Sequence, residues 1–465
     1  ERITVERIKK LFQATDMTVG EPWKQIIRFT VPMLIGNIAQ QLYNTVDSIV
    51  VGQYVGDNAL AAVGSAMPIL NLLLVLFIGI SMGASIMVAQ YFGAKQKEEL
   101  SYTVGNCILL TAIAVVIIMV LSLFLVHPLL KLLNTPDSII GWCYSYLMIM
   151  FLGIVGCAYY NILSGVLRGL GDAFSALVYL LISTVLNIGL DLLFVAKFGM
   201  GVSGVAWATV IAQTVSALLC FLRMTKMTDI FELKFRYIKW NKKYARKIIK
   251  LGLPSGLTQA IFSMAMVVVQ SLTNSFGEMF ISANVIVMRV DGFAMLPNFS
   301  FGTAMTTYAG QNIGAGAFDR VKKGAKQGTF VAVLTTTILT SLILIFGKQL
   351  MGIFTNTTEL VELSRNMMGI IAVGYIAMAV TQSLSGVMRG VGDTMTPMWI
   401  SLFTTIVVRV PVAYGIAYIT RSEAFPNGRQ ECIFISLLCS WLIGALVTTV
   451  FYLKGSWKKK AQAFM

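Results

Sequence analysis

The chain has 465 residues, of which 57% are hydrophobic and 12% are charged, and its net charge at pH 7 is +15. Soluble proteins carry about 25% charged residues. This chain has too few charged residues to cover the water-exposed surface of a soluble protein of its length. The composition excludes a disordered chain, a disulfide-rich secreted protein and a soluble enzyme. Six scattered cysteines without a CxxC pair and one histidine offer no zinc or disulfide framework.

Apolar segments long enough to cross a bilayer, which takes about 20 residues per helix, recur along the whole chain. Many contain Gly, Ser, Thr and Asn, which is typical of membrane helices that pack on one another. We therefore expect an all-α integral membrane protein with twelve transmembrane helices. In chain order the segments are 26–52, 61–89, 103–127, 140–164, 174–196, 204–223, 248–273, 281–308, 328–347, 362–387, 396–419 and 431–453.

The basic residues predict the orientation of these helices. With the amino terminus inside, 28 of the 36 Lys and Arg residues fall on the cytoplasmic side, ten of them between Arg223 and Lys250, in the loop after the sixth segment and at the helix ends that border it. Since Lys and Arg are enriched in cytoplasmic loops, we expect a multi-pass protein of the inner (plasma) membrane with both termini in the cytoplasm. This distribution accounts for the net charge, so no nucleic-acid partner is expected.

An internal repeat divides the chain into two halves. SGVLRGLGD at 164–172 returns as SGVMRGVGD at 385–393, with seven of nine positions identical and a shift of 221 residues. Six helices per copy give parallel repeats, an arrangement found in secondary transporters with the pathway between the halves. The expected parts are a cytoplasmic amphipathic segment at 1–25, an N-lobe at 26–223, a basic cytoplasmic linker at 224–247, a C-lobe at 248–453 and a cytoplasmic tail at 454–465.

Two carboxylates inside apolar segments are the sharpest functional signal, because an ionisable group in hydrocarbon costs several kcal/mol unless it is paired or hydrated. Asp47 lies shortly before the outer loop at 52–56, and Asp191 lies shortly before the outer loop near Gly199. Their depths therefore match, and no Lys or Arg lies in those helices at that depth. Polar residues at helical spacing accompany them: Gln40, Tyr43 and Asn44 in the first segment, Asn187 in the fifth, and Thr209 and Gln213 in the sixth.

Carboxylate, amide and hydroxyl oxygens together form a hard-oxygen site, which suits Na⁺ or protons on carboxyls that burial and mutual repulsion keep protonated. The alternative is that each aspartate caps a helix end at the interface. No GxxxxGK[ST] phosphate loop occurs in the sequence. An ion gradient is therefore the expected source of energy, and no cofactor is expected besides the coupling ion, H⁺ or Na⁺.

At these residues the sequence resembles the MATE (multidrug and toxic compound extrusion) family, and it looks closest to the bacterial DinF-like branch. The likeness rests on VPxLxGxxxQxxYNxVDxxxVGxxxG at 31–56, NxxxD at 187–191 and the LRGxGD turn in both halves. It implies a cation site in the amino-terminal lobe and a bend of the first helix at Pro32. The residues that it assigns to the coupling ion, or to Na⁺ if the protein is sodium-coupled, are Asp47, Asn187, Asp191 and Thr209.

The second half lacks the paired acids. Under the shift of 221–222 residues, Asp47 falls on Val268 or Val269, and Asp191 falls on Val412. The NorM-like branch of the family has further acids in helices 7 and 10, where this chain has glutamines. Arg289 and Asp291 are the exception, either as a structural ion pair or as substrate ligands. The expected substrate-cavity residues are Gln40, Tyr43, Asn44, Gln213, Gln259, Arg289, Asp291 and Gln382.

The expected function is a secondary-active multidrug exporter that exchanges H⁺ or Na⁺ for amphipathic organic cations by alternating access, acting as a monomer in the lipid bilayer. A flippase for lipid-linked precursors, from the same superfamily, is the first alternative, but its anionic substrate calls for a more basic cavity. An integral membrane enzyme is the second, and it would need a constellation of His, acids or Cys at membrane depth. The chain is therefore not expected to be an enzyme.

Overall fold

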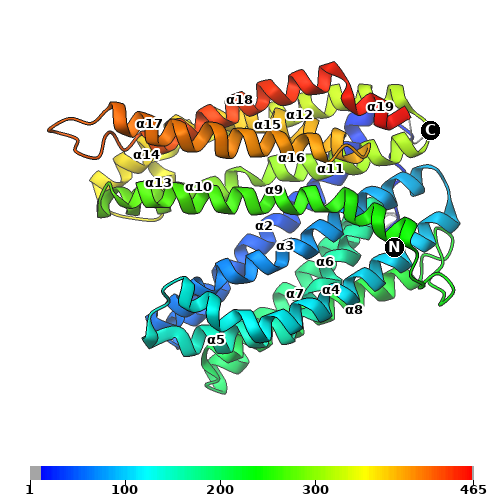
Figure 1. The fold of residues 1–465 in the computed structure, drawn as a ribbon, viewed down its shortest axis with the longest axis horizontal. Helices are drawn as coiled ribbons and strands as arrows, with labels where there is room; N and C mark the ends of the chain where they lie inside the picture. The colour runs from blue at the N-terminus through cyan, green and yellow to red at the C-terminus, as the bar shows by residue number, and fades with distance from the viewer. Residues whose placement is uncertain (1–11, 463–465) are drawn as a thin grey trace, which may run out of the picture. The chain divides into compact units, whose positions relative to one another are not determined.

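The computed structural model describes residues 12–462, and the predictions for residues 1–11 and 463–465 lie outside them. Within the described range the chain is helical and has no strand, so the predicted all-α fold is confirmed (Figure 1). The helices are α2 (Pro22–Tyr54), α3 (Asp57–Gly93), α4 (Lys97–Leu132), α5 (Asp137–Leu152), α6 (Ile154–Gly169), α7 (Ala173–Asp191), α8 (Gly201–Thr225), α9 (Lys242–Asn274), α10 (Glu278–Ala294), α11 (Leu296–Gly314), α12 (Phe318–Ile345), α13 (Gly347–Gly352), α14 (Thr358–Ala372), α15 (Gly374–Gly390), α16 (Met395–Leu402), α17 (Val410–Ile419), α18 (Cys432–Lys454) and α19 (Ser456–Gln462), with π-helical stretches η1 (Leu192–Lys197) and η2 (Phe403–Arg409).

The helices account for the predicted membrane spans. Nine continuous helical stretches of the described chain are long and apolar enough to cross a bilayer, and the bent pairs α5–α6 and α14–α15, with angles of 53° and 42°, raise the number to eleven. Helix α2 makes the twelfth, with 33 residues. Its polar residues, among them Asn44 and Asp47, lower its hydropathy below that of the other spans.

The chain divides into two compact units whose boundaries fall inside α2 and α9. One unit contains Val31–Gly256, and the other contains Met17–Thr30 together with the chain from Leu257 onward. The first turns of α2 therefore pack with the second unit, where the backbone N–H of Trp23 donates to Gln327 Oε1 at 3.2 Å. Prolines lie near both boundaries, Pro32 in α2 and Pro254 in α9.

Within the first unit, α9 crosses α3 through paired glycines. Gly79 and Gly83 on α3 and Gly252 and Gly256 on α9 each form a GxxxG motif. A Cβ at Gly252 would overlap the backbone carbonyl of Gly79, and one at Gly83 would overlap that of Ile248. The backbones approach this closely because only glycine leaves the space, which is typical of membrane helix crossings.

The sequence repeat is also a repeat of packing. Gly165 and Gly169 of α6 lie directly against Ser81 and Ser85 of α3. Shifted by 221 residues, the same contacts recur between α15 and α11, where Gly386 lies against Gly302 and Gly390 against Thr306. Each SGVxRGxGD sequence therefore conserves a small-residue face that brings two helices of its own unit together.

Each RGxGD turn places a buried aspartate just before the start of a helix. In the first, Gly171 has φ +77° and Asp172 accepts hydrogen bonds from the backbone N–H and hydroxyl of Ser175, at 3.0 and 2.7 Å. In the second, Gly392 has φ +98° and Asp393 accepts the hydroxyl of Thr396 at 2.8 Å. Each buried aspartate also pairs with a basic residue. These pairs are Asp172 with Arg223 at 3.2 Å and Asp393 with Lys460 at 2.5 Å.

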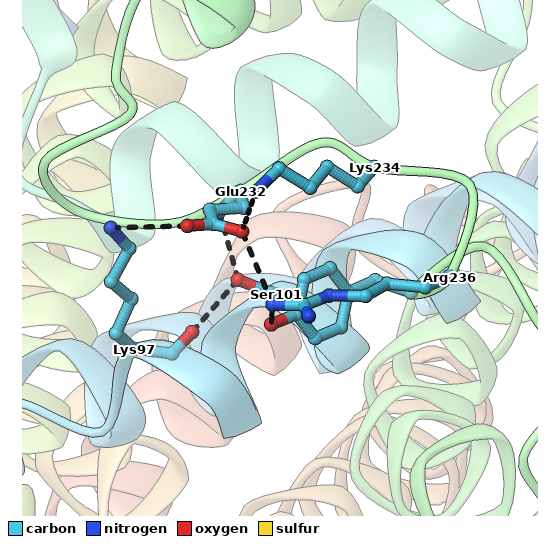
Figure 2. A network of polar contacts seen from close by, with 6 residues as sticks. Lys97, Ser101, Glu232, Lys234 and Arg236 are labelled. Atoms are coloured by element: carbon cyan, nitrogen blue, oxygen red, sulfur yellow. Dashed lines mark hydrogen bonds and ion pairs between the residues drawn. The ribbon is translucent and has the colours of Figure 1, made fainter.

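The basic loop after α8 docks on the first turns of α4 through Glu232 (Figure 2). The backbone N–H of Glu232 donates to Ser101 Oγ at 2.8 Å, and its carboxylate pairs with Lys97, Lys234 and Arg236 at 3.6, 2.7 and 3.3 Å. The hydrogen bond from Lys234 is the main reason why the pKa of Glu232 lies below its usual value. The loop is thus a docked element of the first unit.

Candidate functional site

The first unit brings the two intramembrane aspartates together. Asp47 lies seven residues before the end of α2 and is 8% exposed, and Asp191 is the last residue of α7 and is fully buried. Their side chains lie within hydrogen-bond reach of each other. Two carboxylates this close repel when both are ionised, so the geometry favours one shared proton or a cation between them.

Three further side chains of the predicted set surround the pair. The Tyr43 hydroxyl lies 3.1 Å from Thr209 Oγ1, and the Asn187 amide reaches that same hydroxyl at 3.1 Å. With its NH₂ turned toward Asp191, the Asn187 amide donates to Asp191 Oδ2 at 2.9 Å and its oxygen accepts from Tyr43. Helices α2, α7 and α8 therefore contribute one connected polar cluster of Tyr43, Asp47, Asn187, Asp191 and Thr209.

The carboxylates of this cluster are incompletely satisfied. Oδ1 of Asp47 and Oδ1 of Asp191 are both buried and have no hydrogen-bond partner in the described structure. Neither aspartate forms an ion pair with a Lys or Arg of residues 12–462. A buried carboxylate without a partner is costly, so these two oxygens mark where a proton or a cation gains the most by binding.

The helix-capping alternative does not fit the structure. Asp47 lies inside α2, and the helical path continues beyond Asp191 into η1, where Asp191 makes no capping hydrogen bond. The π-helical stretch begins directly after Asp191. Such stretches often occur at functional sites in helical proteins, and here the wider turn follows the carboxyl that contacts α2.

The donor set suits a hard monovalent cation. It offers two carboxyls, an amide and two hydroxyls, which are the oxygen ligands that hard cations take. Elsewhere in the described chain, and here, no three His, Cys, Asp or Glu residues come together to hold a metal ion. This all-oxygen cluster therefore has ligands that suit a proton or Na⁺, and it lacks the nitrogen and sulfur ligands that most transition-metal sites use.

The remaining predicted cavity residues of the first unit lie outside this cluster. Gln40 and Gln213 are half-buried and Asn44 is exposed. Gln213 lies one helical turn after Thr209, and its Oε1 is buried without a partner in the described chain. The structure thus connects Tyr43 with the ion ligands and leaves Gln40, Asn44 and Gln213 as separate polar positions.

In the second unit, Asp291 does not pair with Arg289 and has two other partners. The hydroxyl of the buried Tyr375 donates to Asp291 Oδ1 at 2.9 Å, and Arg409 in η2 interacts electrostatically with the same carboxylate. Arg289 is exposed and forms no ion pair with a described residue. Gln259 is exposed and Gln382 is half-buried. The carboxylate of this unit therefore has a cationic neighbour inside the protein, unlike the pair in the first.

Two tyrosines near the carboxylates were not found from the sequence. Tyr146 on α5 is buried and interacts electrostatically with both Asp47 and Asp191, and Tyr375 on α15 bonds Asp291. Neither tyrosine has an acidic or basic residue at helical spacing in its own segment that would indicate a role. Arg409 is a charged residue within an apolar segment, but its partner Asp291 lies more than a hundred residues away in the sequence.

Comparison with known proteins decides the family. The MatE family model matches residues 32–193 and again residues 254–415, once in each half of the repeat. The chain belongs to the MATE family. This match confirms the MATE resemblance that the helix-1, helix-5 and LRGxGD residues indicate. MATE proteins are multidrug efflux transporters.

Individual MATE relatives match nearly the whole chain. "Probable multidrug resistance protein YoeA" of Bacillus subtilis is 30% identical over 445 residues, which cover 94% of this chain and 95% of that protein. "Multidrug export protein MepA" of Staphylococcus saprophyticus is 23% identical over a match that covers 84% of this chain and 86% of that protein. A solved structure described as an outward-facing multidrug resistance MATE family transporter has a TM-score of 0.87 at 24% identity, covering 97% and 98%. MATE transporters export small organic compounds, and this one is a multi-pass membrane protein.

Proposed function

We propose that this MATE protein is a cation antiporter in which Asp47 and Asp191 of the first unit carry the coupling ion. The observation that carries the proposal is the contact between these two buried carboxyls, each with an unpartnered oxygen. Because no Lys or Arg of the described chain pairs with them, the negative charge must be balanced by H⁺ or Na⁺. Arg409 balances the negative charge of Asp291, so Asp291 needs no transported ion.

The coupling ion drives export because it favours one conformation of the transporter over the other. It enters from outside, is released to the cytoplasm, and an organic molecule moves outward in exchange. Substrate and ion need not share ligands, since each only has to bind one conformation better than the other. The two six-helix repeats are the elements that alternate between inward-open and outward-open states, and the prolines near both unit boundaries, Pro32 and Pro254, are candidate bending points.

The proposed substrates are amphipathic organic cations. The buried acids carry negative charge into the membrane-spanning part of the first unit, and the names of the relatives describe multidrug resistance and export. The proposed Na⁺ ligands, for a sodium-coupled protein, are Asp47, Asn187, Asp191 and Thr209. The exporter acts as a monomer in the cell membrane with both termini in the cytoplasm, as the distribution of Lys and Arg indicates.

A transport assay in proteoliposomes tests the proposal. The full chain is reconstituted, the membrane potential is clamped at zero with potassium and valinomycin, and a fluorescent organic cation such as ethidium is followed. A pH gradient and a Na⁺ gradient are imposed separately. Accumulation driven by either gradient supports antiport and names the ion. The proposal would be contradicted by dye exchange that depends on neither gradient. It would also be contradicted by translocation of a lipid-linked precursor without transport of the dye.

A further inference from the structure

A groove in the second unit is unrelated to the ion site. It has a volume of about 500 Å³, within the range of small-molecule pockets. It lies among α12, α15, α18 and α19, all within one compact unit. Its walls combine apolar side chains, hydroxyls and lysines and include no acidic residue. They include Lys322, Lys326, Thr329, Leu384, Leu453 and Lys458.

Two of its lysines have no counter-charge. The ammonium groups of Lys326 and Lys458 make no ion pair or hydrogen bond with a described residue. Lys322 has a loose ion pair, 3.7 Å from the carboxylate of Asp319, which is 99% exposed, and its ammonium lies 4.6 Å from the ring centroid of Phe318. Because Lys322 and Lys326 are one turn apart on α12, the two ammonium groups lie on one face, and Lys458 adds the third positive charge from α19.

The aromatic wall of the groove is rigid. Trp457 is fully buried, and its ring stacks with Tyr452 at 5.1 Å and with Phe318 at 5.5 Å between ring centroids. Its Nε1 donates to the backbone carbonyl of Tyr452 at 2.9 Å. This stack holds the start of α19 against the end of α18, so Lys458 is presented from a fixed backbone rather than from a loose tail.

A buried hydroxyl in the groove lacks a partner. Thr329 Oγ1 is buried and has no hydrogen bond within the described chain, although threonines in helices usually bond the carbonyl one turn before. By contrast, Thr449 on the facing helix does so, at 2.7 Å. A polar ligand atom in the groove would satisfy the Thr329 hydroxyl, which is otherwise a costly buried group.

The groove lies where a lipid headgroup would be. Helix α12 begins at Phe318 and α18 ends at Lys454, so the lysines lie at the basic end of the unit, which the enrichment of Lys and Arg places in the cytoplasmic leaflet. Next to them, Leu453 lies one residue before the end of α18, is 68% exposed and forms an apolar part of the groove wall. A cationic rim above an apolar wall matches a molecule with a phosphate and acyl chains.

We propose that this groove binds an anionic phospholipid of the cytoplasmic leaflet. Lys326 and Lys458 contact the phosphate, with Lys322 as a third cation, and Thr329 donates a hydrogen bond to the headgroup or ester region. An acyl chain lies along Leu384 and Leu453. A soluble anion would use the lysines alone and would leave the apolar wall uncovered.

Native mass spectrometry of the purified full chain, titrated with phosphatidylglycerol or phosphatidylcholine, tests the site. Phosphatidylglycerol is expected to bind as a saturable adduct and phosphatidylcholine much more weakly. Each lysine near a membrane surface contributes about fivefold in affinity, so Lys326→Gln with Lys458→Gln should weaken binding about 25-fold. The matched control is Lys239→Gln with Lys242→Gln, which removes two exposed charges, one from the basic loop and one from the first residue of α9, and should change the affinity less than twofold.

A second variant separates a built site from diffuse attraction. Thr449→Phe fills the groove and keeps every charge, so it should lower phosphatidylglycerol binding at least tenfold while the melting temperature stays near that of the wild type. Inorganic phosphate at millimolar concentration should not displace the lipid. The proposal is overturned if the loop control weakens binding as much as the groove variant does. It is also overturned if Thr449→Phe has no effect, or if inorganic phosphate competes with the lipid.

Discussion

The contact between Asp47 and Asp191 sets a quantitative expectation for transport. Because like charges this close disfavour ionisation of both neighbouring carboxyls, we expect one proton to move per cycle if the protein is proton-coupled. A tenfold proton gradient supplies about 1.36 kcal/mol. With the membrane potential clamped at zero, the accumulation ratio of the organic cation should therefore rise about tenfold per pH unit. A sodium-coupled protein should show the same slope against the Na⁺ gradient.

A tenfold rise per pH unit is a slope of one when the logarithm of the accumulation ratio is plotted against the pH difference. Asp191→Asn should reduce that slope from one to zero. The amide has the size of the carboxyl and keeps the contact with Asn187, but it cannot release a proton and it removes one of the two charges that hold a cation. Ethidium should then equilibrate across the membrane without accumulating. The assay is the accumulation ratio at steady state in proteoliposomes, measured at imposed gradients of 0.5, 1 and 2 pH units, which are about 3-, 10- and 100-fold proton gradients, or at the same ratios of Na⁺.

Asp291→Asn is the matched control. It makes the same chemical change in the second unit, where Arg409 and Tyr375 already balance the carboxylate, and it should leave the slope at one. A slope that survives in Asp191→Asn would contradict the role given to Asp191, and a slope that is lost only in Asp291→Asn would show that the ion site is in the other half of the protein. A wild-type slope of two would mean that both carboxyls of the pair titrate in each cycle.

Three further predictions concern packing, ligand geometry and pH. Gly252→Ala should lower the melting temperature, because overpacking at the α3–α9 crossing costs about 1–3 kcal/mol, whereas Gly64→Ala, in open space, should not. Tyr43→Phe removes the hydroxyl between Thr209 and Asn187 and should weaken the apparent affinity for the coupling ion about tenfold, since an unsatisfied buried partner costs about 1–3 kcal/mol; an unchanged half-saturation value would contradict it. The lowered pKa of Glu232 stabilises loop docking fully above the ordinary pKa of about 4.3 and loses that effect as the pH falls through the lowered value. Limited proteolysis of residues 226–241 should therefore become faster in acid. In Glu232→Gln these residues should already be cut quickly at pH 7, and the rate should not rise further as the pH falls.

The sequence by itself determined the parts of the protein that depend on local spacing. The length of each apolar segment predicted twelve helices because a bilayer has a fixed thickness. The repeat of SGVLRGLGD predicted matching halves, and the structure shows why the motif is repeated: Gly165 and Gly169, like Gly386 and Gly390, allow helices of one unit to touch. Asp47 and Asp191 stood out because a carboxylate in hydrocarbon needs a reason to be there.

Only the tertiary structure decided which of these residues meet. Asp47 and Asp191 are 144 positions apart, and their contact follows from how α2 packs beside α7, which no helical periodicity encodes. The same holds for Tyr375 and Arg409 beside Asp291, and for the first turns of α2, which belong to the second unit. A helix pattern specifies which face of each helix is polar, whereas the partner of that face is chosen by side-chain packing among helices distant in the chain.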